Sequence, residues 1–472
     1  MRFAGRVVGH MTSVVRVMLR AGLGAFASLG AIARLGAIAA LAAVAGPPAA
    51  LASQAAPQSQ FVSFGRAGQG VLWSAPERGE RARIGVVLVN PVHSSLGSPL
   101  CKQLAALGYL ALCADWPRAH AHTSDYEPVA ATIRAAIARL REEPRVRAVA
   151  LVGHGEGGAL ALFYQNVARN GPAACQGPEK IAACDAGRLA NLIPADGLLL
   201  LDPDLGQAFM TLTRLDPAVM QETAPTLRHG DLDMYDPRNG FDPGRNAGAY
   251  PPAFRKAFFA AQGERGARLM QDARKLLSAV AARDRDAFSD DMPLFVAGAR
   301  STPLWQVDPG LLSRTRRPHK VLGADGAVGN RVLASIAPPS GNPREAGSLR
   351  AAAWFTARHY LASHAIVTTH DYDVTADDVR GVVWGTSMTS ALSNAAGVRD
   401  PILLMAMTAH YALRPAEMIL DAAASSDKEL VGVEGATHAL TPCGVCPEPA
   451  AAYGDTLRRT MEYVDRWLLK RF

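Results

Sequence analysis

Apolar and polar residues alternate in blocks along the chain from Ile84 to about Gly206. Four blocks are mostly apolar and predict strands, at Ile84–Val89, Tyr109–Cys113, Val146–Val152 and Gly197–Leu201. Such runs fit strands that are buried on both faces of a sheet. Between them, apolar residues recur every three or four positions and predict helices, at Leu100–Leu107, Tyr126–Glu142 and Ala159–Arg169. This alternation predicts an α/β fold, with a mostly parallel sheet and helices on both faces.

The rhythm changes between about Gly206 and Arg399. This segment combines joints rich in proline and glycine with few strand signals, and its long helical patterns lie at Pro252–Gln262, Ala267–Ala282 and Ala346–Ser363. We interpret it as a large, mainly helical cap inserted over a site.

The alternation then returns, with strands predicted at Pro401–Met407 and Glu429–Val433 and helices at Pro415–Ala424 and Thr456–Leu469. The predicted organisation is therefore a core in two parts, residues 53–205 and 400–472, separated by the cap, residues 206–399.

The first 52 residues carry arginines but no acidic residue. After Arg34 the apolar stretch Leu35–Ala45 leads to a small-x-small site, Ala50-Leu51-Ala52. This order predicts a secretory signal peptide over residues 1–52. The alternative is a membrane anchor, but a span takes about 20 apolar residues. We expect export to the periplasm or beyond the cell, with no stable membrane span after cleavage.

Loss of the signal changes the charge balance. The chain has 49 basic and 42 acidic residues, and five basic residues lie in the signal, so the mature chain is near +2. The net charge of +7 is therefore mostly a property of the signal. No basic stripe is interleaved with aromatic residues, so we predict a small-molecule substrate or ligand and no nucleic-acid partner.

Six cysteines fit an oxidising compartment. The spacing favours three local disulfides, between Cys101 and Cys113, Cys175 and Cys184, and Cys443 and Cys446, although sequence alone does not fix the connectivity. The C-x-x-C pair could instead be a redox dithiol or half of a zinc site. Because neither a thioredoxin-like surround nor a second C-x-x-C is present, a structural bridge is the better interpretation.

A glycine-rich motif, Val152-Gly-His-Gly-Glu-Gly-Gly158, lies where a predicted strand passes into a helix. It resembles the G-x-S-x-G nucleophile elbow of α/β-hydrolases, whose flanking residues are small so that strand and helix can pack closely. Gly153 and Gly157 match those flanks. At the position of the catalytic serine the chain has Gly155.

The resemblance to the α/β-hydrolase superfamily extends over roughly residues 84–206 and 400–472. It implies that His438, in the loop after the last predicted strand, is the catalytic histidine. The acid is expected near Ala409 and His410, where no carboxylate stands, or after the preceding strand, which gives Asp202 or Asp204. Asp202 is the preferred acid, although an aspartate before Pro203 could equally cap a turn.

The resemblance also implies an oxyanion hole. Its donors would be the backbone N–H groups of Glu156, Val92 and His93. Further residues that could line the pocket are His154, Ser387 and Glu417. Ser387 lies in a Gly-Thr-Ser-Met segment that resembles the serine motif of subtilases, but the other motifs of that family are missing. We predict no metal and no cofactor.

Three functions remain open. The protein could hydrolyse esters with His438 as the base for direct attack by water, since the acyl-enzyme route needs a nucleophile. It could be a pseudoenzyme that binds a small apolar ligand. It could also be a lyase or another cofactor-free enzyme that uses the histidine. The sequence favours the first, a carboxylic-ester hydrolase with an atypical elbow.

Overall fold

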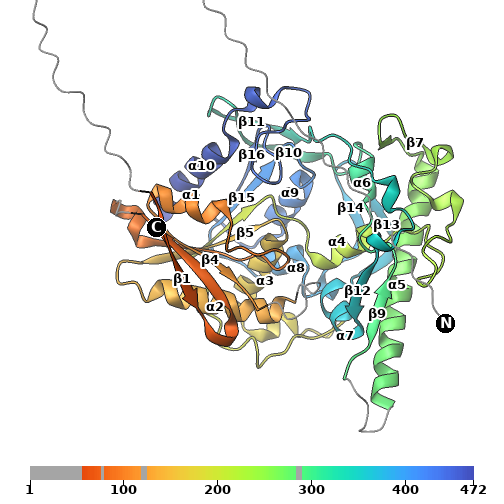
Figure 1. The fold of residues 1–472 in the computed structure, drawn as a ribbon, viewed down its shortest axis with the longest axis horizontal. Coiled ribbons are helices and arrows are strands. Elements are labelled where there is room, and N and C mark those ends of the chain that lie inside the picture. The colour runs from red at the N-terminus through yellow and green to blue at the C-terminus, as the bar shows by residue number, and fades with distance from the viewer. Residues whose placement is uncertain (1–55, 76–78, 118–124, 283–289) are drawn as a thin grey trace, which may run out of the picture. The chain divides into compact units, whose positions relative to one another are not determined.

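The computed structural model describes residues 56–75, 79–117, 125–282 and 290–472 (Figure 1). The predicted signal peptide lies outside the described residues. Residues Ala55–Phe472 form one compact unit.

A ten-stranded sheet runs through this unit in the order β1-β2-β4-β3-β5-β6-β15-β16-β10-β11. Neighbours from β4 to β10 pair in parallel, whereas β1, β2 and β11 pair antiparallel at the two edges. The strands are β1 Gln58–Ser63, β2 Gln69–Ser74, β3 Ile84–Leu88, β4 Leu110–Asp115, β5 Ala148–His154, β6 Gly197–Leu201, β10 Arg314–Leu322, β11 Val328–Ala334, β15 Ile402–Met407 and β16 Lys428–Val433. The predicted, mostly parallel sheet is confirmed.

Alternate residues of each central strand face two separate cores. In β6, Leu198 and Leu200 pack into one core and Leu199 and Leu201 into the other. Helices cover both faces of the sheet, as Figure 1 shows. Consecutive parallel strands are joined by crossover segments that contain these helices. α2 (Tyr126–Arg141), α3 (Glu156–Asn170) and α9 (Leu413–Ala422) cover the first core, and α1 (Pro99–Leu107) and α10 (Thr456–Arg471) cover the second.

The segment 206–399 differs from the predicted, mainly helical cap. It contains helices α4 (Gln207–Arg214) and α5 (Pro252–Ala282), but also two-stranded sheets and the pair β10–β11, which extends the main sheet beside β16. The small sheets pair β9 (Pro293–Val296) with β12 (Ala353–Thr356), β13 (Val367–Val374) with β14 (Val379–Val383), and β7 (Phe241–Asp242) with β8 (Ala247–Gly248). Mixed α/β structure is therefore the correct description of this segment.

Two predicted elements of the insertion are wrong in detail. The helices predicted at 252–262 and 267–282 form one helix, α5. The helix predicted at 346–363 is replaced by a 3-10 turn at Leu349–Ala351, the strand β12, the short helix α7 (Ala357–His359) and a π-helix at Tyr360–His364. The π-helix packs on the core through His364, whose Nδ1 lies 2.8 Å from Thr211 Oγ1 of α4.

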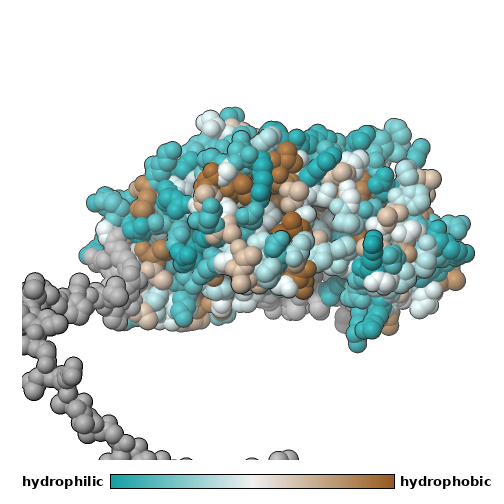
Figure 2. Space-filling view, turned by 90° about the horizontal axis from the view of Figure 1, so that it is seen from above, coloured by the Kyte–Doolittle hydropathy of each residue, from teal (hydrophilic) through white to brown (hydrophobic). Residues whose placement is uncertain are grey.

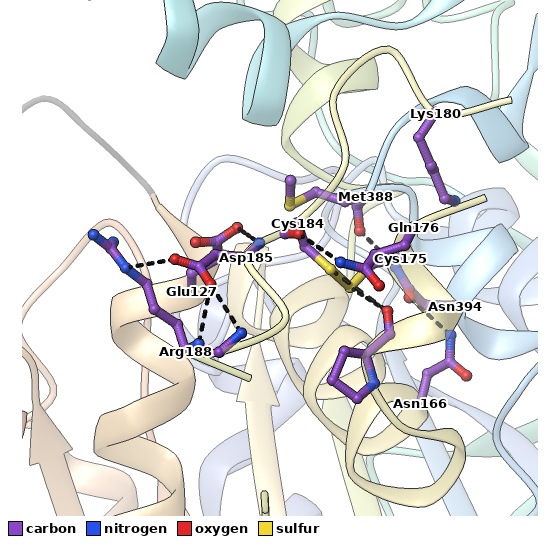
Figure 3. Close-up of a disulfide and its surroundings, with 12 residues drawn as sticks. Glu127, Asn166, Cys175, Gln176, Lys180, Cys184, Asp185, Arg188, Met388 and Asn394 are labelled. Atoms are coloured by element: carbon purple, nitrogen blue, oxygen red, sulfur yellow. Dashed lines mark hydrogen bonds and ion pairs between the residues drawn. A yellow bond between two sulfur atoms is a disulfide. The ribbon is translucent and has the colours of Figure 1, made fainter. Parts of the chain in front are cut away.

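Three disulfides close local loops, Cys101–Cys113, Cys175–Cys184 and Cys443–Cys446, which confirms the predicted pairs. Figure 3 shows the second of them, in the loop that follows α3. Nearby, the Asp185 N–H donates to the Glu127 carboxylate of α2. Lys180 Nζ donates to the Gly385 oxygen at 2.8 Å, and the Ile181 N–H donates to the Thr386 oxygen at 2.9 Å. The loop is thus tied both to α2 and to the end of the insertion.

The face seen in Figure 2 is mostly hydrophilic, with hydrophobic residues in a few small patches. Over the described residues, no helix combines the length and the apolar character that crossing a membrane requires. The longest helix, α5, has 31 residues and carries arginines and lysines along its length.

Candidate active site

The turn between β5 and α3 is built around Gly155, which has φ 56° and ψ −121°. Its flanks have no room for side chains. A Cβ on Gly153 would lie 2.2 Å from the Gly157 oxygen, and one on Gly158 would lie 2.6 Å from Pro203 Cβ. Glycine at these positions therefore lets β5, α3 and the loop after β6 approach closely.

The imidazole of His438 lies against this turn. A Cβ added to Gly155 would be 2.9 Å from His438 Cε1 and 3.0 Å from its Nε2. The histidine follows β16, in a tight turn that the Thr437 N–H closes by donating to the Thr441 oxygen. The Nε2 edge of the ring is thus directed at the elbow.

Asp202 holds the other edge of the same ring. His438 Nδ1 donates to Asp202 Oδ2 at 2.7 Å, and the carboxylate has no exposed surface. Asp202 follows β6 and has a positive φ of 51°, which turns its side chain toward the neighbouring strand β15. There the Met407 N–H donates to Oδ1 at 3.0 Å. Both oxygens of the carboxylate are therefore fixed by their neighbours.

A second histidine, His410, contacts the same carboxylate. Its Nδ1 lies 2.6 Å from Asp202 Oδ2, but the direction does not fit a hydrogen bond. Its ring centroid is 4.6 Å from that of His438. His410 was not among the predicted site residues, although its place after β15, where the resemblance puts the acid, was a signal that could have found it.

The charges of these groups support one another. Burial alone would raise the pKa of the Asp202 carboxyl, but His410 and His438 outweigh it and hold that pKa well below its usual range. For His438, burial lowers the pKa, and the hydrogen bond and charge of Asp202 more than compensate, so the pKa is raised. Asp202 is therefore an anion that stabilises the positive charge that His438 gains when it accepts a proton.

His154, the last residue of β5, supports the loop that carries His438. Its Nε2 lies 2.7 Å from the His438 carbonyl oxygen, and the two rings stack with centroids 4.6 Å apart. Burial first, and the charge of His438 second, lower the pKa of His154. We therefore interpret His154 as a neutral side chain that donates to the carbonyl.

Asn90, after β3, organises the predicted oxyanion loop. Its Oδ1 accepts the N–H groups of Val92 and His93, each at 2.8 Å, and its Nδ2 donates to the His154 oxygen at 3.2 Å. Two of the three predicted oxyanion donors are thus already bonded to a side chain of their own loop. Glu156, the first residue of α3, stands directly after Gly155, and it is the remaining predicted donor.

The glycine turn, the aspartate and the two histidines all lie at one edge of the sheet. Parallel strands β5, β6, β15 and β16 are neighbours, and the tight turn, Asp202, His410 and His438 follow their carboxyl ends in that order. The parallel strands β4-β3-β5-β6-β15-β16 are flanked by the antiparallel β2. The chain has the α/β-hydrolase fold.

Solved structures resemble this α/β-hydrolase fold at low sequence identity. They include a hypothetical protein from Pseudomonas aeruginosa (12% identity, TM-score 0.40, 89% of this chain and 95% of that one), a monoacylglycerol lipase from Paleococcus ferrophilus (14%, 0.34, 88% and 99%) and a proline iminopeptidase from Mycobacterium smegmatis (10%, 0.37, 88% and 98%). No protein-family model matches the chain. No curated protein matches it either.

Two predicted pocket residues have other roles in the α/β-hydrolase fold. Glu417 is buried in α9, where its carboxylate bonds His319, Arg414 and the backbone N–H groups of β10. Ser387 is buried and its hydroxyl bonds Thr389. Both side chains are engaged inside the protein, because a buried polar group needs a partner, and neither bonds Asp202 or His438.

Three side chains could hold a metal ion. Asp202, His410 and His438 each offer one ligand atom, and these atoms lie within 4.8 Å of one another. The group is the same one that lines the elbow.

Proposed function

We propose that this protein is an exported hydrolase that cleaves carboxylic esters by direct attack of water, without an acyl-enzyme. In this fold the nucleophilic serine lies in the sharp turn between a strand and the following helix. In this chain that turn joins β5 to α3 and carries Gly155. One observation carries the proposal. His438 is bonded through Nδ1 to the buried Asp202, while its Nε2 lies 3.0 Å from the Cβ that Gly155 lacks.

The reaction needs no group beyond these. A water molecule at Nε2 loses a proton to His438 as its oxygen attacks the ester carbonyl. The oxyanion then meets the N-terminus of α3, where the Glu156 N–H and the helix dipole favour negative charge. When the intermediate collapses, the imidazolium returns the proton to the leaving alkoxide, and an acid and an alcohol result. Asp202 stabilises the imidazolium between the two steps.

The expected rate is modest. A triad that lacks its nucleophile keeps roughly 10³–10⁴-fold acceleration over water from the oxyanion hole and substrate binding. A correctly placed base adds on the order of 10²–10⁴-fold. Slow turnover that depends on His438 is therefore the signature of this mechanism.

Export is part of the proposal. The three disulfides are typical of a chain that matures in an oxidising compartment. We expect the mature protein to begin at Ser53 and to act on small molecules.

The test uses short-chain nitrophenyl esters and the mature protein. We expect slow turnover by the native chain, and a loss of at least about 10²-fold in His438→Ala and in Asp202→Asn, since both remove the oriented base. His370→Ala is the matched control, because His370 is exposed on β13 and should leave the rate unchanged. A native rate equal to the buffer rate, or a His438→Ala variant as fast as the native chain, would refute the proposal.

A binding protein without catalysis is the second candidate. The bonds of Val92 and His93 to Asn90 favour it, because they leave fewer donors for an oxyanion. It predicts a higher melting temperature with a small apolar ligand and no turnover, since a ligand that binds only the native state stabilises it.

A further inference from the structure

We propose that Asp202, His410 and His438 form a binding site for one divalent transition-metal ion. Their ligand atoms, Oδ2 and two Nδ1 nitrogens, lie within 4.8 Å of one another. Each residue follows the carboxyl end of a different strand, and the three strands, β6, β15 and β16, are adjacent in the sheet. Ligands on neighbouring strands of a rigid sheet are held in position before an ion arrives.

The bonding of His410 is a second, independent observation. Its Nδ1 is buried and lies 2.6 Å from Asp202 Oδ2, yet no atom of the described residues forms a hydrogen bond with it in acceptable geometry. The nitrogen has the carboxylate as an ion-pair neighbour but gains no well-directed hydrogen bond from it, and an unmade hydrogen bond at a buried atom is costly. An ion placed between this nitrogen, the carboxylate and His438 Nδ1 would satisfy all three atoms, in exchange for the Nδ1 protons, which pass to solvent.

The site needs little rearrangement. Imidazole nitrogen and carboxylate oxygen bind zinc at about 2.0–2.2 Å, so two ligand atoms of one tetrahedral ion lie roughly 3.3 Å apart. The nitrogens now lie 2.6 and 2.7 Å from Oδ2, so the side chains must separate by roughly 0.7 Å. The histidines have room to move, since the side chain of His410 is 28% exposed and that of His438 is 42% exposed.

The surroundings suit a single carboxylate ligand. Oδ1 of Asp202 already accepts the Met407 N–H at 3.0 Å, which leaves Oδ2 to bind the metal. Backbone bonds of this kind orient metal ligands and are part of most sites. The stack of His154 on His438 supports the ring from the side of β5.

The ligand set indicates the class of metal. Two imidazoles and one carboxylate suit zinc, iron(II), cobalt or manganese, whereas calcium and magnesium prefer oxygen ligands throughout. Three protein ligands leave at least one position open for water, as in catalytic zinc sites. The inference goes beyond the proposed function and describes an alternative state of the same residues, because an ion on Oδ2 and His438 Nδ1 would replace the hydrogen bond that orients the base.

The experiment measures zinc binding without any ester. The mature protein is stripped with a chelator and titrated with Zn²⁺ by calorimetry, alongside a thermal melt. We expect one ion per chain and a higher melting temperature. His410→Ala should weaken the affinity by at least about tenfold, while His370→Ala, which removes an exposed histidine on β13, should not change it. Circular dichroism of His410→Ala confirms that the variant folds.

Two results would overturn the inference: no binding up to millimolar Zn²⁺, or binding that His410→Ala leaves unchanged. Asp202→Asn gives a second test, because it removes the charge of the ligand but keeps its shape. Binding is read without substrate, so failure of the hydrolysis proposal and failure of the metal proposal are seen in separate measurements.

Discussion

At the scale of single residues, the contact between Gly155 and His438 controls what a substitution at the elbow can do. A Cβ at Gly155 would lie 2.9–3.0 Å from the imidazole, closer than ordinary van der Waals contact. The partly exposed ring can yield by a few tenths of an ångström. A side chain at this position would then lie beside Nε2, the atom that accepts a proton in a serine triad.

We therefore expect Gly155→Ser to create a nucleophile. The variant should take a fluorophosphonate label and hydrolyse nitrophenyl esters faster than the native chain, because the hydroxyl gains a base that Asp202 already orients. Mass spectrometry of the labelled protein measures the first effect.

Gly155→Ala is the matched control for this variant. It fills the same space without a hydroxyl, so it should take no label. Equal labelling of both variants would show that another residue reacts, and no labelling of either would show that the base does not reach the elbow.

The sequence predicted part of the site and missed the rest. Asp202, His438 and the elbow glycines were found because the resemblance fixes their order along the chain, and the structure brings them together. His410 was missed because a histidine stood where an acid was sought. Asn90 was missed because its contacts depend on how its loop folds back, which no pattern along the chain records.

At the scale of elements, helix α5 shows why the insertion was hard to predict. Gly263 and Gly266 interrupt its pattern and suggested a break. In the structure they are close contacts, since a Cβ on Gly263 would lie 2.8 Å from Thr368 Oγ1 of β13 and one on Gly266 would lie 3.3 Å from Leu212 of α4. Tertiary packing thus overrides the helix propensity of glycine. The strand β11 was missed because most of its residues are exposed, so it lacks the apolar pattern by which a buried strand is predicted.

The π-helix Tyr360–His364 gives the protein a pH-dependent element. Burial, and next the charge of His359, hold the pKa of His364 well below its usual value. His359 Nε2 lies 3.0 Å from His364 Nε2, and Asp125 and Asp291 are the acidic groups that act on His359. His364 is therefore neutral in the folded protein, whereas in the unfolded chain it binds a proton below about pH 6.5.

We expect the free energy of unfolding to fall as the pH drops below about 6.5, by up to about 1.4 kcal/mol per pH unit for this proton, until the folded pKa is reached. The variant His364→Phe has no such proton to bind, so it should lose less unfolding free energy than the native chain when the pH is lowered from 7.5 to 5. Urea denaturation at both pH values measures the effect. Parallel pH curves for the two proteins would contradict it.

At the scale of the whole molecule, the mostly parallel sheet and the two helical layers follow from the alternation of apolar blocks, and the structure confirms both. What the alternation does not contain is the position of β10 and β11. These strands belong to the insertion by sequence but to the main sheet by pairing, since β10 joins β16 in parallel. Pairing over about a hundred positions leaves no local trace in the chain.

Removal of a disulfide should lower the stability of the whole unit by an amount that rises slowly, as the logarithm of the loop length. The Cys101–Cys113 pair spans 12 positions, so the double variant to alanine should lose about 3 kcal/mol of unfolding free energy. The Cys443–Cys446 pair spans 3 positions and should cost less, about 2 kcal/mol. Chemical denaturation of the two double variants gives the comparison, and a larger loss for the shorter loop would show that strain or packing, rather than chain entropy, dominates.

The hydrogen bond between Asp202 and His438 joins residues 236 positions apart. This contact requires the intervening chain to close and β15 to lie between β6 and β16. A partly folded chain that has the first half of the sheet would therefore have the elbow but no site. Reactivity at this edge would therefore report complete folding. A molecule bound there would stabilise the contact between the part of the core before the insertion and the part after it.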